Sequence, residues 1–245
     1  MKHVLALFLT LTILLGSLPS CGQNVRPLTA QPVSVSPENS KTVNQALANF
    51  GVSLLQNVRE IQGTSVLISP LSVTLALSMA ANGAEGDTLT QFEKVLGGGV
   101  PLTELNAACA QLLLDYKNLG GSTECSIANS LWADPEGKIR EDFIGECQGI
   151  FDSQVFSQEL SAPSVVPAVN GWVSDHTNKM IPSILDRPFS EYAALLLVSA
   201  LYLNNTWETE FDPNNTCLHE FYHQGTSKET IDSLNIGFVR FPYLQ

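Results

Sequence analysis

The sequence predicts an α+β fold in which helices come first and strands follow. Between residues 41 and 119, apolar side chains recur at helical spacing in segments separated by glycine or proline. After residue 125, short runs rich in strand-forming residues dominate, and the longest is "YAALLLVSALYLN" at residues 192–204. The chain has 245 residues, of which 44% are hydrophobic. That composition suffices for one large domain with a well-developed core.

The first 39 residues are expected to precede this domain. Residues 1–20 combine a short basic start with an apolar stretch, as in a secretory signal peptide, and the stretch is too short to span a bilayer. "LPSC", ending at Cys21, resembles a bacterial lipobox, which would leave Cys21 lipidated; the alternative is ordinary cleavage near Ser20. Residues 21–39 are polar and proline-rich and are expected to be a tether. On this interpretation we expect the protein to be exported to the bacterial cell envelope or the extracellular space and to be anchored to the membrane through Cys21.

Two helices are predicted at the start of the domain. Residues 41–60 form an amphipathic pattern. Residues 73–81 form the body of a second helix that stops at an Asn-Gly pair. Ser69 or Ser72 can cap this second helix, with Pro70 in the first turn, where its missing N–H costs nothing.

The remaining elements follow from local signals. Asp87 or Thr88 is expected to cap a third helix that runs to Leu96 and is closed by three glycines. The other expected elements are helices at 102–119, 141–151 and 165–181 and strands at 125–134, 192–204 and within 206–245.

The charge and the cysteines limit the possible functions. The formal net charge is −12, and a nucleic-acid binder needs a basic surface, so we expect no nucleic-acid partner. After Cys21, four cysteines remain, and none forms a C-x-x-C pair that would indicate a metal knuckle or a thioredoxin-type site. They are Cys109, Cys125, Cys147 and Cys217, and the sequence leaves open whether they are free thiols or form disulfides.

Two motifs suggest enzymatic chemistry. "HEFYH" at residues 219–223 matches the zinc motif in which two histidines one helical turn apart hold the metal and a glutamate acts as base. The flanking turn residues favour a strand, on which His219 and His223 would lie ~13 Å apart, so we expect no metal site. Ser69 and Ser72 lie outside any G-x-S-x-G motif, so neither is expected to be a nucleophile.

Several segments, in order, resemble the serpin family. They are "SPLSVTLALSMAANGAEGDT" at 69–88, "ANSLW" at 128–132, "VNGWVSDHTNKMIPSIL" at 169–185, "LLVSALYLNNTWETEFDP" at 196–213 and "TCLHEF" at 216–221. One difference is Ser199, which stands where the family usually has asparagine. The resemblance covers residues 40–245 and implies the N-terminal two-thirds of a serpin domain, with helices around a large mixed main sheet.

The resemblance also implies roles for individual residues. Small hydroxyls behind the centre of the main sheet would let two strands part and close again, whereas a large side chain would obstruct that movement. Such shutter positions are Ser69, Ser72 and Ser199. Trp207 would anchor the top of the sheet, and the helix that crosses the sheet would pack through Asn170, Trp172 and Thr177.

The function implied by the resemblance is inhibition of serine or cysteine proteases. Such an inhibitor is a suicide substrate rather than an enzyme, needs no cofactor and is expected to be a monomer when complete. In the family, further strands and the exposed reactive loop follow the matched segments, so this chain is expected to lack the loop and to be inactive alone. Two alternatives are a non-inhibitory binding protein with a serpin fold and an envelope metallohydrolase that uses "HEFYH".

Overall fold

A computed structural model describes residues 25–62, 66–120, 123–207, 210–223 and 227–233. Its helices are α1 (Lys41–Gln62), α2 (Pro70–Asn82), α3 (Gly86–Gly97), α4 (Leu102–Lys117), α5 (Glu141–Phe151) and α6 (Val165–His176). Its strands are β1 (Arg26–Pro27), β2 (Glu124–Ala133), β3 (Ser153–Ser157), β4 (Leu195–Asn204), β5 (Cys217–His223) and β6 (Ser227–Ser233). Helices therefore precede most strands, and the α+β prediction is confirmed.

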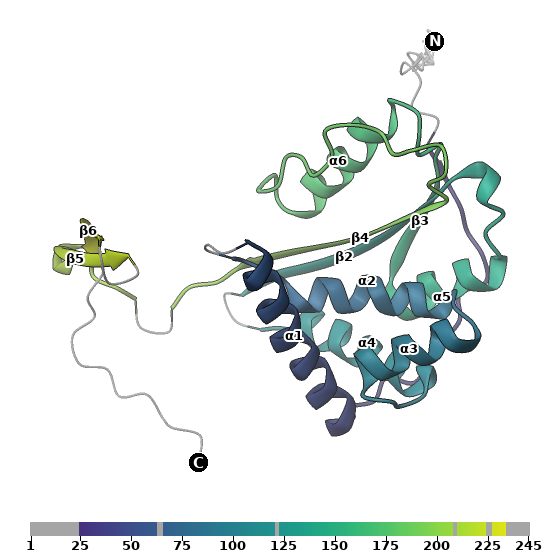
Figure 1. Cartoon of the computed structure of the whole chain (residues 1–245), viewed down its shortest axis with the longest axis horizontal. Helices are drawn as coiled ribbons and strands as arrows, with labels where there is room; N and C mark the ends of the chain where they lie inside the picture. The colour runs from purple at the N-terminus through teal and green to yellow at the C-terminus, as the bar shows by residue number, and fades with distance from the viewer. Residues whose placement is uncertain (1–24, 63–65, 121–122, 208–209, 224–226, 234–245) are drawn as a thin grey trace, which may run out of the picture.

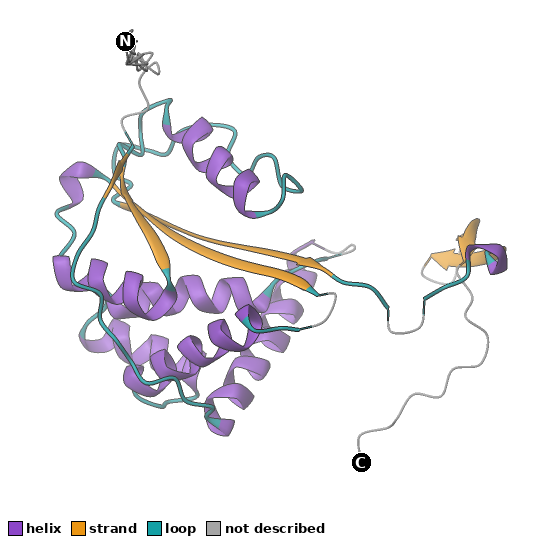
Figure 2. Cartoon of the chain, turned by 180° about the vertical axis from the view of Figure 1, so that it is seen from behind, coloured by secondary structure: helices purple, strands orange, loops and turns teal. Residues whose placement is uncertain are grey.

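The main sheet is mixed and has the strand order β1-β3-β2-β4. β2 runs parallel to β3 and antiparallel to β4, and β1 is antiparallel to β3. Helices α2, α4 and α5 pack on one face of the sheet, and α6 covers the other (Figures 1 and 2). β5 and β6 form a separate antiparallel hairpin, which lies apart from the main body in Figure 1.

Alternate residues of β4 enter two different cores. Leu195 and Leu197 pack into the core formed with α1 to α5. Val198 and Ala200 point the other way, into the core beneath α6. Because side chains alternate along a strand, this explains why the run is apolar throughout: β4 is covered on both faces.

The predicted helix signals are largely found where expected. Ser69, not Ser72, is the N-cap of α2, and its Oγ accepts a hydrogen bond from the Ser72 N–H at 3.3 Å. Gly98 closes α3 in the left-handed conformation, with φ of 67°. The predicted cap of α3 is wrong, because this helix begins at Gly86 and its N-cap, Glu85, makes no side-chain capping bond.

Helix α6 ends at His176, five residues before the expected end. Asn178 and Lys179 adopt positive φ values of 48° and 63°, which a helix cannot continue through. The Lys179 N–H donates to the carbonyl of Ser174 at 2.8 Å, the bond that closes a Schellman-type helix end.

Residues 25–38 form a strap that crosses the domain surface. The strap pairs with β3 through β1, and the Val33 N–H donates to the carbonyl of Gly145 at 3.0 Å. Near its end, the Glu38 N–H donates to the carbonyl of Ala107 at 3.2 Å. The expectation of a tether from 21 to 39 is therefore corrected for residues 25–38, because their backbone groups bond to the domain. Residues 21–24 and the predicted signal peptide lie outside the described residues.

The four cysteines after residue 21 are all free thiols. Cys109 and Cys147 are buried, and burial raises the pKa of the Cys109 thiol to about 11 and that of Cys147 to about 12. Both thiols are protonated at neutral pH and act as small apolar groups. None of the helices in the described ranges is both long and apolar enough to cross a bilayer.

A reciprocal amide pair joins α2 to α4 in the core. Asn82 Nδ2 donates to Asn106 Oδ1 at 3.0 Å, Asn106 Nδ2 donates to Asn82 Oδ1 at 2.8 Å, and both residues are buried. Asn106→Ala should lower the free energy of unfolding by about 1–3 kcal/mol, because it leaves Asn82 Oδ1 without a donor in the core, while Asn82 Nδ2 keeps only its bond to the carbonyl of Ser78. Urea unfolding of Asn82→Ala, Asn106→Ala and the double variant checks this. If the two single losses simply add, the amides are not coupled.

Candidate functional site

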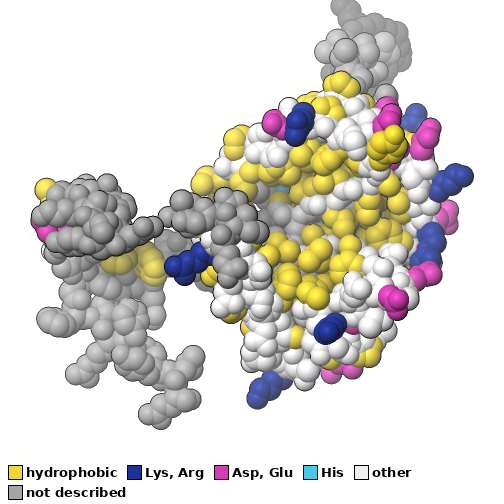
Figure 3. All heavy atoms as spheres, in the orientation of Figure 1, with side chains coloured by type: hydrophobic (Ala, Val, Ile, Leu, Met, Phe, Trp, Pro, Cys, Tyr) yellow, Lys and Arg dark blue, Asp and Glu magenta, His cyan; other side chains and the backbone are white. Residues whose placement is uncertain are grey.

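The outer edge of β4 is the main feature that the fold leaves open. β4 pairs with β2 along its whole length, from Leu195 opposite Ala133 to Asn204 opposite Glu124. Within the described ranges no strand pairs with its other edge. Figure 3 shows hydrophobic side chains gathered on the face that carries this edge, between α6 and the helices around α2. An unpaired strand edge beside apolar surface is suited to receive another strand.

The start of α2 places two predicted shutter residues together. The hydroxyl of Ser69 donates to the Ser72 hydroxyl at 2.9 Å, and both side chains are half-buried. Pro70 occupies the first turn between them. α2 packs against β4, so the pair lies on the helix that supports this strand. The shutter role itself stays a prediction.

The third predicted shutter residue, Ser199, lies on the face of β4 that is turned toward α2. It shares this face with Leu197, which packs in the same core as α2. Ser199 lies directly opposite Asn129 of β2. Asn129 is 2% exposed and donates its Nδ2 to the carbonyl of Phe151 at 2.8 Å.

Two polar atoms of this cross-strand pair lack hydrogen bonds. Asn129 Oδ1 and Ser199 Oγ are both buried, and the described residues offer neither a hydrogen-bond partner. Unpaired buried polar groups cost free energy, so this position is a weak point in the β2–β4 interface.

Ser72→Leu tests how tightly the start of α2 is packed. We expect it to lower the free energy of unfolding by about 1–3 kcal/mol, because a branched side chain overfills the half-buried site and removes the acceptor of Ser69. Ser72→Ala is the matched control, which loses the hydroxyl without adding volume. Thermal or urea unfolding of both variants measures the two changes in stability. Equal midpoints for Ser72→Leu and the unaltered protein would show that the site has spare room.

Asn170 of α6 holds the segment that follows the helix. Its Oδ1 accepts from the backbone N–H groups of Ile184 and Leu185 at 2.8 and 2.9 Å. Its Nδ2 donates to the carbonyl of Leu185 at 2.8 Å. Asn170 therefore acts through three hydrogen bonds rather than through packing alone.

Trp172 attaches α6 to the sheet. It is 7% exposed and lies in the core beneath α6, and its Nε1 donates to Gln154 Oε1 of β3 at 2.7 Å. His176 stacks on its ring at a centroid distance of 4.3 Å. Thr177 ends the helix: its Oγ1 donates to the carbonyl of Val173 and accepts from the Ile181 N–H. These contacts fix α6 across the sheet.

The described residues do not bury Trp207 against the sheet, so its predicted role as an anchor stays a prediction. Trp207 lies three residues beyond the end of β4 and is 70% exposed. Its ring contacts Phe211 edge-on at 5.7 Å.

The "HEFYH" segment forms β5, so the strand prediction is confirmed. His219 pairs with Ile231 and His223 with Ser227 of β6. Residues four apart on a strand are ~13 Å apart, too far to share one metal ion. Within the residues that the structure describes, no group of three or more His, Cys, Asp or Glu side chains is placed to hold a metal.

Three features of the site were not predicted from the sequence: Asn129 opposite Ser199, Gln154 beneath Trp172, and the strap. For the strap a signal was present. Gly145 and Gly149 lie four residues apart on α5, and a helix face with two such glycines allows close backbone approach. Asn129 and Gln154 gain their roles only through strand pairing and helix docking.

Comparisons with known proteins identify the family. A profile of the Serpin (serine protease inhibitor) family matches residues 45–237. Iripin-1 of Ixodes ricinus is 28% identical over 220 residues, which are 86% of this chain and 56% of that protein. Intracellular coagulation inhibitor 2 of Tachypleus tridentatus is 28% identical over 213 residues, 85% of this chain and 51% of that protein.

The fold agrees with these relatives. The solved structure of the thermophilic serpin tengpin in the latent state has a TM-score of 0.71 and 27% identity, and the match covers 81% of this chain and 53% of that one. The chain spans about half the length of the curated relatives it matches. Its order of helices and its mixed main sheet are those of the serpin fold. The chain therefore belongs to the serpin family.

Proposed function

We propose that the protein inhibits proteases by inserting a cleaved loop of its complete form as a new strand beside β4. The observation that carries this proposal is the outer edge of β4, which has no strand partner in the described ranges and is bordered by apolar surface. A strand added there would gain backbone hydrogen bonds over the ten residues of β4. The name of one relative, Intracellular coagulation inhibitor 2, also supports an inhibitory role.

The chemistry of the proposal is that of a suicide substrate. A serine or cysteine protease attacks the exposed loop, and its nucleophile forms an ester or thioester with the new carbonyl end while the amine end is released. Insertion of the loop then carries the attached protease across the sheet and distorts it before water can hydrolyse the bond. The protein itself supplies no catalytic group, so it is not an enzyme in this scheme.

Two features of the structure support this proposal. The start of α2 offers two small hydroxyls, Ser69 and Ser72, that keep each other hydrogen-bonded while the strands above them move. Ser199 of β4 and its neighbour Asn129 of β2 leave two buried polar atoms without hydrogen bonds, so few side-chain bonds hold the β4 position nearest α2 in place. Both features favour movement of β4 over a rigid core.

The test uses protein produced from its complete coding sequence, incubated with a panel of serine and cysteine proteases. We expect a complex that survives denaturing electrophoresis, with a mass equal to the protease plus the inhibitor without its released peptide. A protease with its nucleophile replaced by alanine is the control and should give no such complex. Clean cleavage without any complex would favour the alternative of a non-inhibitory binding protein.

The predicted membrane attachment extends this proposal. Lipidation at Cys21 would hold the inhibitor at the bacterial envelope, where it meets proteases outside the cell. Expression in a bacterial host that processes lipoproteins, followed by detergent fractionation, tests it. Cys21→Ala should move the protein from the membrane to the soluble fraction. Equal fractions for both forms would show that Cys21 is not the anchor.

A further inference from the structure

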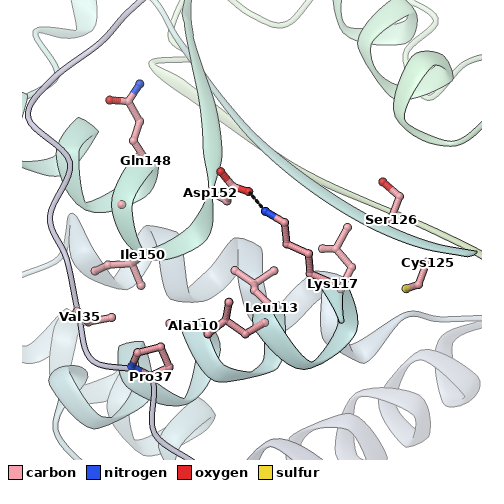
Figure 4. A pocket seen from close by; sticks show the side chains of 13 residues that line it. Val35, Pro37, Ala110, Leu113, Lys117, Cys125, Ser126, Gln148, Ile150 and Asp152 are labelled. Atoms are coloured by element: carbon pink, nitrogen blue, oxygen red, sulfur yellow. Dashed lines mark ion pairs between the residues drawn. The ribbon is translucent and has the colours of Figure 1, made fainter. Parts of the chain in front are cut away.

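The strap is held to the domain along its length. At its start β1 pairs with β3, and the Leu28 N–H donates to the carbonyl of Val155 at 2.8 Å. Gln148 of α5 binds the next part: its Nε2 donates to the carbonyl of Leu28 and its Oε1 accepts from the Ala30 N–H, both at 3.0 Å. Further along, Val35 packs against the core and lies beside α4 and α5 in Figure 4. The strap is therefore a fixed part of the domain and not a flexible linker.

The strap begins at one end of the main sheet, which we call the proximal end (Figure 1). Arg26 of the strap lies opposite Ser157, the last residue of β3. The same row of the sheet contains Ala133, the last residue of β2, and Leu195, the first residue of β4. Because β3 runs toward this end and β1 is antiparallel to it, the chain before Arg26 approaches the sheet from beyond the proximal end.

The docked strap keeps the predicted lipid anchor close to the proximal end. The chain advances five residues from Cys21 to Arg26, and a fully extended chain spans at most about 3.6 Å per residue, which limits this distance to about 18 Å. The distal end, where Glu124 lies opposite Asn204, is ~30 Å from the proximal end along the strands. If the strap were free, the chain from Cys21 to Lys41 at the start of α1 could extend about 70 Å and allow any orientation.

The surface of the proximal end is compatible with a layer of lipid headgroups. Tyr192 lies three residues before β4 and is 87% exposed, and tyrosine is favoured at the boundary between headgroups and water. Exposed side chains of both charges lie at the same end: Glu136 and Lys138 follow β2, and Glu159 follows β3. Since the signs are mixed, the position of the anchor decides the orientation more than the surface charge does.

We propose that the docked strap holds the membrane-bound protein with the proximal end of the main sheet toward the lipid surface and the distal end toward the solvent. This inference rests on the membrane attachment at Cys21 proposed above. The short reach from Cys21 to Arg26 and the direction of β1 both place the proximal end next to the bilayer. The distal end of β4 and the chain that follows it are then open to proteases in the solvent.

Energy transfer from a donor dye on the protein to rhodamine-labelled lipid in phosphatidylcholine vesicles tests this orientation. The dye is attached to Glu136→Cys at the proximal end or to Glu124→Cys at the distal end, in lipidated protein made from the complete coding sequence. The pair is matched, because both glutamates are exposed and lie at opposite ends of the same strand, β2.

The native thiols do not interfere once Cys125 and Cys217 are replaced by serine. Cys109 and Cys147 are buried, and burial raises the pKa of their thiols to about 11 and about 12, so they stay unlabelled. A second form carries Cys21→Ser, has a six-histidine segment in place of residues 1–20 and binds vesicles with nickel-chelating lipids. It keeps the same attachment point without lipidation, so a failure of lipidation can be distinguished from a failure of the orientation.

We expect at least about twofold more energy transfer from Glu136→Cys than from Glu124→Cys, because the two ends of the sheet are ~30 Å apart. Gly149→Ala should release the strap and reduce this difference, because its Cβ would lie 1.9 Å from the carbonyl oxygen of Val33. Gly171→Ala, which adds the same methyl group on α6, should preserve it.

Equal transfer from the two labels on the nickel-chelating vesicles, or a full difference that persists in Gly149→Ala, overturns the proposal. The expected difference on those vesicles supports the orientation even if the protein from the lipoprotein-processing host stays off the membrane. In that case only the lipidation of Cys21 is contradicted.

Discussion

Trp172→Ala should detach α6 from the main sheet and lower the free energy of unfolding by about 3–5 kcal/mol. The indole is almost fully buried in the core beneath α6, and its loss leaves a large cavity there. The hydrogen bond to Gln154 and the stacked ring of His176 are lost with it. Urea unfolding followed by far-UV circular dichroism measures the change.

Two further variants separate the contributions of Trp172. Trp172→Phe keeps an aromatic ring but removes the N–H, so it should retain much of the stability. Gln154→Leu removes the other partner of the same bond and should cost about 1 kcal/mol. The removal of a buried indole normally costs several kcal/mol. If Trp172→Ala lowers the free energy of unfolding by less than about 1 kcal/mol, α6 is held to the sheet by other contacts.

Gly149→Ala should release the strap and lower the free energy of unfolding by about 1–3 kcal/mol. The added Cβ would lie 1.9 Å from the Val33 carbonyl oxygen and 2.6 Å from its nitrogen, so the strap backbone has to move. Hydrogen exchange measures this displacement directly. The amides of Val33 and Glu38, which bond to the domain, should lose their protection.

Gly171→Ala is the matched control for Gly149→Ala. Gly171 also lies within a helix, but apart from its chain neighbours and the backbone of its own helix no described atom lies within 4 Å of the position that its Cβ would take. Alanine there should raise the free energy of unfolding by about 0.5–1 kcal/mol through helix propensity. Opposite signs for the two substitutions identify close packing of the strap as the cause. Unchanged exchange at Val33 in Gly149→Ala would contradict the account of the strap.

The helices and β4 could be predicted from the sequence because their signals are local. Ser69 and Pro70 mark the start of α2, and the glycines after Leu96 mark the end of α3, within one or two turns of chain. β4 is apolar on both faces, a pattern too short for a membrane helix and typical of a covered strand. The largest error in a predicted helix end is that of α6. Its end is set by Asn178 and Lys179, which adopt positive φ although neither is a glycine.

The remaining features depend on contacts between distant parts of the chain. β3 has only five residues, too few for its own sequence to predict a strand. It forms a strand because it pairs with β2. The strap is proline-rich and polar, which indicated a tether, yet it docks through backbone groups on a glycine-lined face of α5. Trp207 was placed in the sheet by resemblance alone, and the described contact of its ring is with Phe211.

The central claim is that β4 accepts a new strand at its outer edge. Hydrogen exchange of the complete protein, before and after limited cleavage of its exposed loop, tests this claim most directly. The account predicts that the β4 amides facing away from β2 become more strongly protected after cleavage, together with a higher melting temperature. Unchanged exchange along Leu195–Asn204 after complete cleavage would contradict it, because an inserted strand has to bond to those amides.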